Sequence, residues 1–167
     1  MKKVVLFFTI ISLFFNAIGF SGCVGGDSDL QIARNVAQDI MDCFINKDEE
    51  ALYSLLSPNA QNFHLTREQI QEAFEFIDGE IISYDLPTTT GGGGHSKENG
   101  VITAKNMTPR IRNIVTNSGD IYKICFDYRL ILESDRNSEG LDDIIIRLME
   151  SEYGEKYLEE VVIGIEP

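Results

Sequence analysis

The chain has 167 residues, and its 27 acidic and 14 basic side chains give a formal net charge of −13 at pH 7. Such a charge argues against nucleic acid as a partner, because nucleic-acid binding needs a cationic surface. It also argues against a direct electrostatic hold on anionic lipid headgroups, and the length suits one domain with its own core.

The first 22 residues have the layout of a secretory signal peptide. Lys2 and Lys3 form a positive start, residues 4–15 are almost wholly apolar, and residues 16–22 are small and mildly polar. The apolar run reaches 17 residues if it is extended to Phe20, whereas a membrane-spanning helix needs about 20. A permanent transmembrane anchor is therefore the weaker alternative, and we predict that residues 1–22 are removed.

The end of this segment reads Phe20-Ser21-Gly22-Cys23. Two small residues before a cysteine resemble the lipobox of bacterial lipoproteins, although Phe20 stands where leucine is usual. The resemblance implies that the Cys23 thiolate accepts a diacylglyceryl group and becomes the lipidated N-terminus. The protein would then be held to the extracytoplasmic face of the cell membrane, while an ordinary signal peptide followed by an unrelated cysteine is the alternative.

Helices are predicted to come first in the remaining chain. Residues 23–29 are expected to form a short flexible connection to the membrane, followed by a single domain over residues 30–167. Apolar residues spaced by three and four predict amphipathic helices over 30–47, 49–56 and 67–78.

Two helix starts have recognisable caps. Asp48 precedes the second predicted helix, and Pro58 is expected to mark its end. Thr66 followed three residues later by Gln69 predicts a capping box at the start of the third helix.

After Gly79 the hydrophobic period changes from that of a helix to that of a strand. The Gly-rich, polar stretch 88–100 lacks the Gly-Lys-Ser/Thr ending of a phosphate-binding loop. It is expected to be a mobile, irregular connection, with a functional flap as the alternative. Strands are predicted at 80–86, 101–104, 110–116, 121–133, 141–150 and 157–165. Helices followed by antiparallel strands predict an α+β fold.

The strand predicted at 121–133 alternates cleanly. One face carries Tyr122, Ile124, Phe126, Tyr128, Leu130 and Leu132, and we expect it to cover the helices. The other face mixes charged and apolar residues, and we expect it to be either solvated or partly covered by a partner. On that face Arg110, Arg112 or Arg147 could pair with Asp127 or Glu133 across strands.

The element order carries a second resemblance. Three helices, the second of which contains the run DEEALYSLLS over residues 48–57, precede a curved antiparallel sheet. This pattern, over about residues 30–165, is similar to the NTF2-like, cystatin-like cone fold. Together with the lipobox, it resembles uncharacterised Gram-positive lipoprotein families that carry such a domain.

The cone fold implies a pocket at its open end, lined by aromatic residues of the inner sheet face. Tyr122, Phe126 and Tyr128 are the candidates, and each has core packing as its alternative role. Asp85 and His64 are expected near the mouth, where either could act as an acid or base, although both also suit turns or caps.

No metal site, cofactor or catalytic motif is predicted, because His64 and His95 are far apart and neither has a Cys or His at metal spacing. Cys43 and Cys125 lie on apolar segments, so they are either buried thiols or an exported disulfide. The sequence leaves these two options open.

The leading hypothesis is a lipid-anchored, non-catalytic module that binds a small apolar ligand, a peptide or an envelope protein in its cone or on its sheet. A small-molecule enzyme is the first alternative, with Asp85 or His64 and Tyr122 or Tyr128 as its acid–base groups. The second alternative is a structural protein that forms a homodimer through its sheet.

Overall fold

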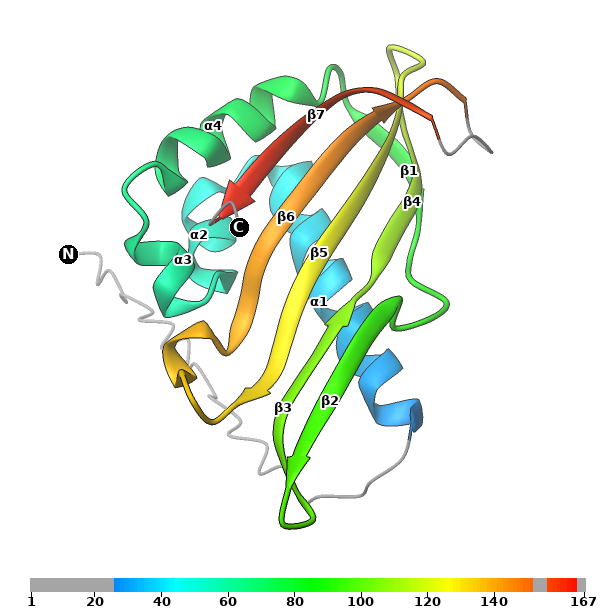
Figure 1. The fold of residues 1–167 in the computed structure, drawn as a ribbon. Helices are drawn as coiled ribbons and strands as arrows, with labels where there is room; N and C mark the ends of the chain where they lie inside the picture. The colour runs from blue at the N-terminus through cyan, green and yellow to red at the C-terminus, as the bar shows by residue number, and fades with distance from the viewer. Residues whose placement is uncertain (1–25, 152–155, 165–167) are drawn as a thin grey trace, which may run out of the picture.

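The computed structural model describes residues 26–151 and 156–164. In this part of the chain, helices on the N-terminal side pack on a seven-stranded antiparallel sheet that does not close into a barrel (Figure 1). The predicted α+β class is confirmed. The predicted signal peptide and Cys23 lie outside the described residues.

The helical part contains four α-helices among the described residues. They are α1 (Gly26–Asn46), α2 (Glu49–Leu55), α3 (Pro58–Asn62) and α4 (Thr66–Phe76). Because α1 begins at Gly26, residues 26–29 form its first turn. The prediction that they belong to a flexible connection is wrong.

The short helix α3 differs from the prediction, in which Pro58 marks the end of the preceding helix. Pro58 instead occupies the first turn of α3, where a missing N–H costs no hydrogen bond. Ser57 caps this helix through its hydroxyl, which accepts a hydrogen bond from the Ala60 N–H at 3.2 Å. Asp48 caps α2 in the same way by accepting from the Ala51 N–H at 2.9 Å, as predicted.

The capping box predicted for α4 does not form. Thr66 lies inside the helix, and its hydroxyl donates to the Ala60 carbonyl oxygen at 2.6 Å. The Gln69 side chain instead accepts a hydrogen bond from the Gly164 N–H at 3.1 Å. Long-range partners thus replaced the local contact that the spacing suggested.

In the described part of the chain, seven strands follow the helices, and six of them correspond to predicted strands. They are β1 (Ile81–Asp85), β2 (Gly92–Glu98), β3 (Val101–Thr108), β4 (Arg110–Thr116), β5 (Ile121–Leu132), β6 (Gly140–Met149) and β7 (Tyr157–Gly164). The unpredicted strand is β2, which pairs with β3 over the stretch expected to be irregular. The turn between β5 and β6 holds one 3-10 turn over Arg136–Ser138.

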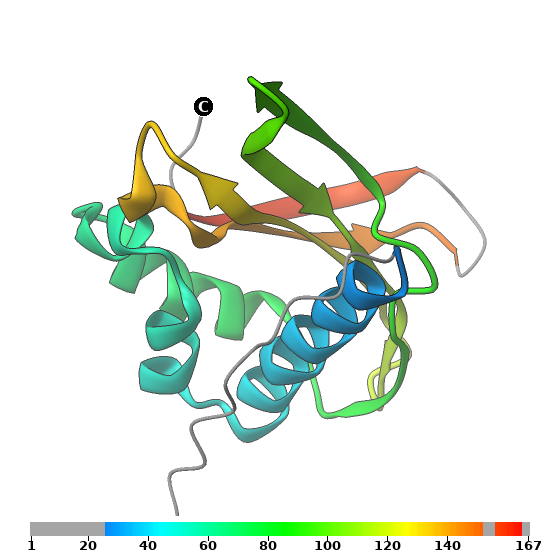
Figure 2. The same ribbon diagram turned by 90° about the horizontal axis from the view of Figure 1, so that it is seen from below.

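Strand β5 is the centre of the sheet. Its first half pairs with β4 and its second half with β3, so these two consecutive strands share one edge of β5. Strands β6 and β7 continue the sheet on the other edge. Figure 2 shows the helices on one side of the sheet, with α1 crossing that face and the β2–β3 hairpin rising from the opposite side.

The core lies between the helices and the inner face of the sheet. Tyr122, Ile124 and Phe126 of β5 are at most 2 % exposed, which confirms the predicted inner face over the first half of the strand. The rest of that face, at Tyr128, Leu130 and Leu132, is only partly buried. Ile40 and Met41 of α1 are fully buried in the same core.

The outer face is charged, but its ion pairs differ from those expected. Arg147 pairs with Glu160 of β7 at 2.8 Å. Asp127 is approached by Arg129 of its own strand at 3.8 Å. Arg110 and Arg112 take part in none of the ion pairs found among the described residues.

Cys43 and Cys125 are both free thiols. Cys43 is buried on α1, whereas Cys125 lies on β5 between the core residues Ile124 and Phe126 and so points to the outer face. Among the described helices, none combines the length and the apolar composition needed to cross a membrane.

Candidate functional site: a cationic pocket beside β1

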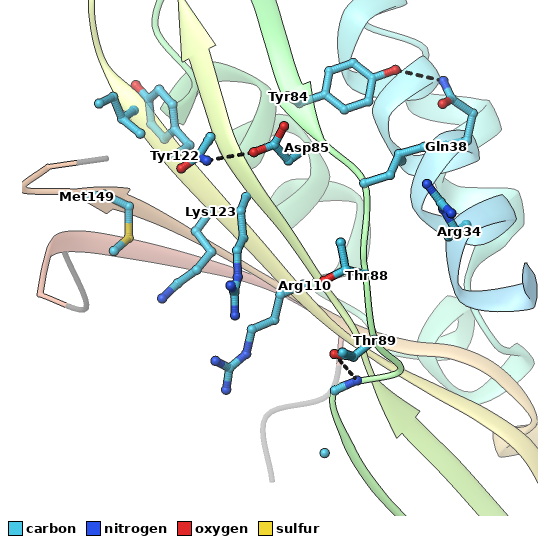
Figure 3. Close-up of a pocket in the computed structure, with 16 residues that line it drawn as sticks. Arg34, Gln38, Tyr84, Asp85, Thr88, Thr89, Arg110, Tyr122, Lys123 and Met149 are labelled. Carbon is cyan, nitrogen blue, oxygen red and sulfur yellow. Dashed lines mark hydrogen bonds between the residues drawn. The ribbon is translucent and has the colours of Figure 1, made fainter. Parts of the chain in front are cut away.

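A cavity of about 990 Å3 lies where α1, β1, β4 and β5 meet the connection between β1 and β2. Figure 3 shows this cavity, which we call the cationic pocket. Its lining consists of Arg34, Gln38, Tyr84, Asp85, Leu86, Thr88, Thr89, Gly91, Gly92, Arg110, Arg112, Asn113, Ile121, Tyr122, Lys123 and Met149.

Positive charge dominates this lining. Four of the chain's 14 basic residues line the pocket, namely Arg34, Arg110, Arg112 and Lys123. Of the described acidic residues, Asp85 alone does so. A chain with a net charge of −13 therefore concentrates cations at one cavity.

Strand β4, which carries two of these cations, contains a β-bulge. Ile111 pairs with Ile124 and Ile114 with Tyr122, so β4 has one residue more than β5 between the two pairs. Asn113 lies in the bulge and has a left-handed φ of 49°, a conformation that asparagine adopts more readily than most residues.

Arg110 and Arg112 precede the bulge and lie on the same side of the sheet as Lys123, because Ile111 pairs with Ile124 on the buried face. In Figure 3, Arg110 and Lys123 point in the same direction, away from α1, whereas Arg34 comes from α1 itself. The Asn113 amide donates to Asp85 Oδ2 at 2.7 Å, which ties the end of β1 to the bulge. The cations thus come from two walls of the pocket.

A side-chain hydrogen bond links the α1 wall to β1. Gln38 Nε2 donates a hydrogen bond to the Tyr84 hydroxyl oxygen at 2.9 Å (Figure 3). Arg34 lies four residues earlier on α1, so it is on the same face of the helix as Gln38. Arg34 is consequently held against the pocket rather than free to turn elsewhere with the helix.

The connection between β1 and β2, which includes Gly91, forms the third wall of the pocket and is hydrogen-bonded to the end of β3. The Thr108 N–H donates to the Thr90 carbonyl oxygen at 3.1 Å, and the Thr108 hydroxyl donates to the Gly92 carbonyl oxygen at 2.8 Å. Gly91 has a φ of +73°, and a Cβ at this position would overlap the Thr108 carbonyl oxygen. Glycine is therefore required for the connection to lie this close to the end of β3.

The predicted site residues are only partly brought together. Tyr122 and Asp85 line the cationic pocket, whereas Phe126 is 1 % exposed in the core and lines neither cavity. Tyr128 is half-buried and also lies outside both cavities. His64 is exposed, and its ring packs against Phe63 with 4.9 Å between the ring centroids.

The two tyrosines are held as neutral phenols. The Tyr122 hydroxyl accepts from the Asp78 N–H at 3.0 Å and donates to the Phe76 carbonyl oxygen at 3.2 Å. Burial raises the pKa of Tyr122 above its ordinary value. Burial also raises the pKa of Tyr128, and the nearby Asp39 carboxylate adds to this effect.

The four cations were missed as a group by sequence reasoning. Arg110 and Arg112 were expected to pair with acidic residues across strands. Arg34 lies on the polar side of a predicted helix, where a charged residue is ordinary. The available signal was that Arg110 and Arg112 share one face of a predicted strand whose hairpin partner carries Lys123. The packing of α1, β4 and β5 that brings them together depends on tertiary structure.

A smaller cavity of about 370 Å3 lies on the outer face between β2, β3 and β5. Its lining includes the cations Lys105 and Arg129, but both are already neutralised. Lys105 pairs with Asp29 at 2.6 Å, and Arg129 pairs with Asp142 at 2.7 Å. The two cavities therefore differ in charge balance as well as in size.

Fold and site together define an α+β domain with an open antiparallel sheet and a cationic pocket at the edge formed by β1. Residues 39–155 match the family described as Domain of unknown function (DUF5104). Because this match covers more than half of the chain, the protein belongs to that family. None of the curated proteins compared with the chain matches it.

Proposed function

We propose that the protein is a membrane-anchored, non-catalytic ligand-binding module whose ligand occupies the cationic pocket. The observation that carries this proposal is the cavity of about 990 Å3, which reaches the upper end of the size range of ligand sites, about 300–1,000 Å3. Its lining places apolar side chains such as Tyr84, Leu86 and Met149 beside polar and charged groups, so it can contact both kinds of surface on a ligand.

We further propose that the domain is NTF2-like and is anchored by lipid at Cys23 on the extracytoplasmic face of the cell membrane. The crossing of α1 over the inner face of a curved sheet supports the first part. The positive, apolar and small-residue segments that end at Cys23 support the second part. Because α1 begins at Gly26, only two residues separate Cys23 from the first helix, so the domain would lie close to the bilayer.

The contacts of the pocket residues favour binding over acid–base catalysis. The Tyr122 hydroxyl is engaged by two backbone groups, and Asp85 accepts a hydrogen bond from Asn113. His64 lies outside the pocket and Tyr128 lines neither cavity, so Asp85 with Tyr122 is the one pair considered from the sequence that shares the pocket. A catalytic pair must reach the same reacting group.

The test is a thermal-shift screen of a chemically diverse compound library on the protein extracted from membranes in nonionic detergent. Thr88 is exposed and lines the pocket, so Thr88→Trp fills the cavity. Gln71→Trp adds the same side chain on the exposed face of α4 as a control. We expect at least one compound to stabilise the protein and the Gln71→Trp variant but not the Thr88→Trp variant. Stabilisation that survives in Thr88→Trp, or no stabilisation by any compound, would contradict the proposal.

A further inference from the structure

Three of the four pocket cations are arginines without an ion pair in the part of the chain that the structure describes. Arg34, Arg110 and Arg112 take part in none of the ion pairs found among the described residues. Five other cations do form such pairs: Arg67, Lys105, Arg129, Arg147 and Lys156. In so acidic a chain, these arginines face one described acid in the pocket lining, Asp85, which lies opposite Arg112 in the register of β1 and β4.

The arrangement of the three arginines suits an oxyanion ligand. A guanidinium group presents donors in a planar fork that matches the oxygens of phosphate and carboxylate groups. Arg110 and Arg112 come from one wall, beside Lys123, and Arg34 comes from the α1 wall (Figure 3). Positive charge on two walls favours a ligand with more than one anionic group.

The rest of the lining suits an organic ligand rather than an inorganic ion alone. Tyr84 and Leu86 present apolar surface between the two charged walls, and the hydroxyl-bearing Thr88 and Thr89 line the same cavity. The volume of about 990 Å3 exceeds that of a single phosphate or carboxylate group many times over.

We propose that the cationic pocket binds a small organic polyanion, whose phosphate or carboxylate groups are held by Arg34, Arg110 and Arg112. This inference names the ligand class of the proposed function and rests on it. The net negative charge of the chain disfavours anions in general, whereas the four cations of the pocket favour them locally.

The ligand has two possible sources with the same chemistry. Arg34 follows the start of α1 by eight residues, which corresponds to about 12 Å along a helix. An anchor at Cys23 would thus place the pocket near the bilayer surface, so the anionic groups belong either to a lipid headgroup or to a free solute.

The experiment is calorimetric titration of pyrophosphate and of citrate into the protein in nonionic detergent. Two anions are used because pyrophosphate carries phosphate groups and citrate carries carboxylates. We expect saturable binding of at least one of them, weakened at least tenfold in the Arg110→Gln/Arg112→Gln double variant. Affinity should also fall as salt rises.

Two control variants separate the pocket from general electrostatics. Arg136→Gln/Lys97→Gln removes the same charge from exposed positions outside the pocket and should change affinity less than twofold. Asp85→Asn removes the one described acidic group of the lining and should tighten binding severalfold. No saturable binding of either anion, or equal losses in the two double variants, would overturn the inference.

The source of the ligand is distinguished by reconstitution into vesicles of phosphatidylcholine with or without phosphatidylglycerol. Weaker binding of the titrated anion only when phosphatidylglycerol is present indicates headgroup competition, and unchanged binding indicates a free solute. Either result is consistent with an anion site.

Failure of the inference is distinguishable from failure of the proposed function. A neutral compound from the library screen that is blocked by Thr88→Trp but unaffected by Arg110→Gln/Arg112→Gln would retain the ligand-binding module and overturn the polyanion. If no library compound and neither anion bind, both are overturned.

Discussion

Asn113 shows how one residue affects the direction of side chains along a strand. Its left-handed conformation takes up the extra residue of the β4 bulge, and its amide holds Asp85. Arg110 and Arg112 precede the bulge and lie on the same side of the sheet as Lys123. Without the bulge, one residue fewer would lie between Ile111 and Ile114. The side chains at one end of β4 would then point to the opposite face of the sheet.

Asp143 provides a pH-dependent test at the residue scale. Burial raises its pKa, and the neighbouring Asp127 and Asp142 add to the rise. The folded state therefore holds a proton on Asp143 more tightly than the unfolded state does. Its contribution to stability is complete below the ordinary pKa of 3.8 and is lost as the pH rises through the raised folded value.

We therefore expect Asp143→Asn to raise the Tm at pH 7, with the gain shrinking toward zero below pH 3.8. The Asn side chain can still accept the hydrogen bond that the Asp127 N–H now donates to Asp143 at 3.1 Å. The measurement is Tm against pH, with Glu72→Gln on the exposed face of α4 as the control. A Tm that falls at pH 7 would show that the carboxylate is stabilising after all.

Cys43 gives a second residue-scale prediction. Burial, together with the nearby Asp48, raises the pKa of this thiol to about 11. At pH 8 only roughly a thousandth of it is the reactive thiolate. We expect iodoacetamide to leave Cys43 unmodified in the native protein but to modify it after unfolding, as measured by peptide mass spectrometry. Cys125, which is partly exposed, is the internal comparison, and rapid native modification of Cys43 would refute the prediction.

At the scale of elements, regular periodicity was a good guide and close backbone contacts were not. The alternation in β5 and the helical spacing in α1 follow from burial of one face, so both could be read from the sequence. Strand β2 could not, because glycine has little strand propensity and its place in the sheet depends on pairing with β3.

The same distinction explains the candidate site. Tyr122 and Asp85 were predicted because a tyrosine on an inner face and an acid at a strand end are conspicuous in the sequence. The arginines were not, since an isolated arginine in a sequence is usually a solvated charge. They line one cavity only because α1, β4 and β5 come together in the tertiary structure.

The glycine-rich connection makes a sharp prediction at this scale. Gly91→Ala places a Cβ against the Thr108 carbonyl oxygen and requires a φ that alanine disfavours. We expect the free energy of unfolding to fall by roughly 1–3 kcal/mol, the usual cost of overpacking. Affinity for the pocket ligand should fall as well, because Gly91 lines the cavity.

Gly94→Ala is the matched control, because a Cβ at Gly94 meets nothing within 4 Å. Its free energy of unfolding should change by no more than about 0.5 kcal/mol, as at other permissive surface positions. Urea unfolding measures both variants. Equal effects at the two positions would mean that the contact between Gly91 and Thr108 does not matter.

For the molecule as a whole, the anchor and the pocket are separate claims. Cys23→Ser removes the thiol that the proposed lipid attachment needs, so the variant should be released from the membrane or accumulate as uncleaved precursor. Fractionation followed by mass measurement of the N-terminus tests this. Undiminished membrane association of a processed Cys23→Ser protein would contradict lipid anchoring and leave the pocket unaffected.

The distribution of charge is the other property of the whole molecule. A net charge of −13 favours solubility and disfavours anionic partners in general, yet the cationic pocket reverses the sign locally. Composition describes the first property and only the fold describes the second. The average charge of a chain therefore does not decide what its cavity binds.

The most direct test of the central claim is an NMR titration of pyrophosphate and of citrate in turn into isotopically labelled protein in nonionic detergent, following the arginine Nε–Hε signals. We predict that at least one anion shifts Arg34, Arg110 and Arg112 together along one saturable curve, while Arg136 and Arg67, which lie outside the pocket, stay unchanged. Uniform shifts in all arginines, or no saturable shift in the three pocket arginines with either anion, would contradict the account.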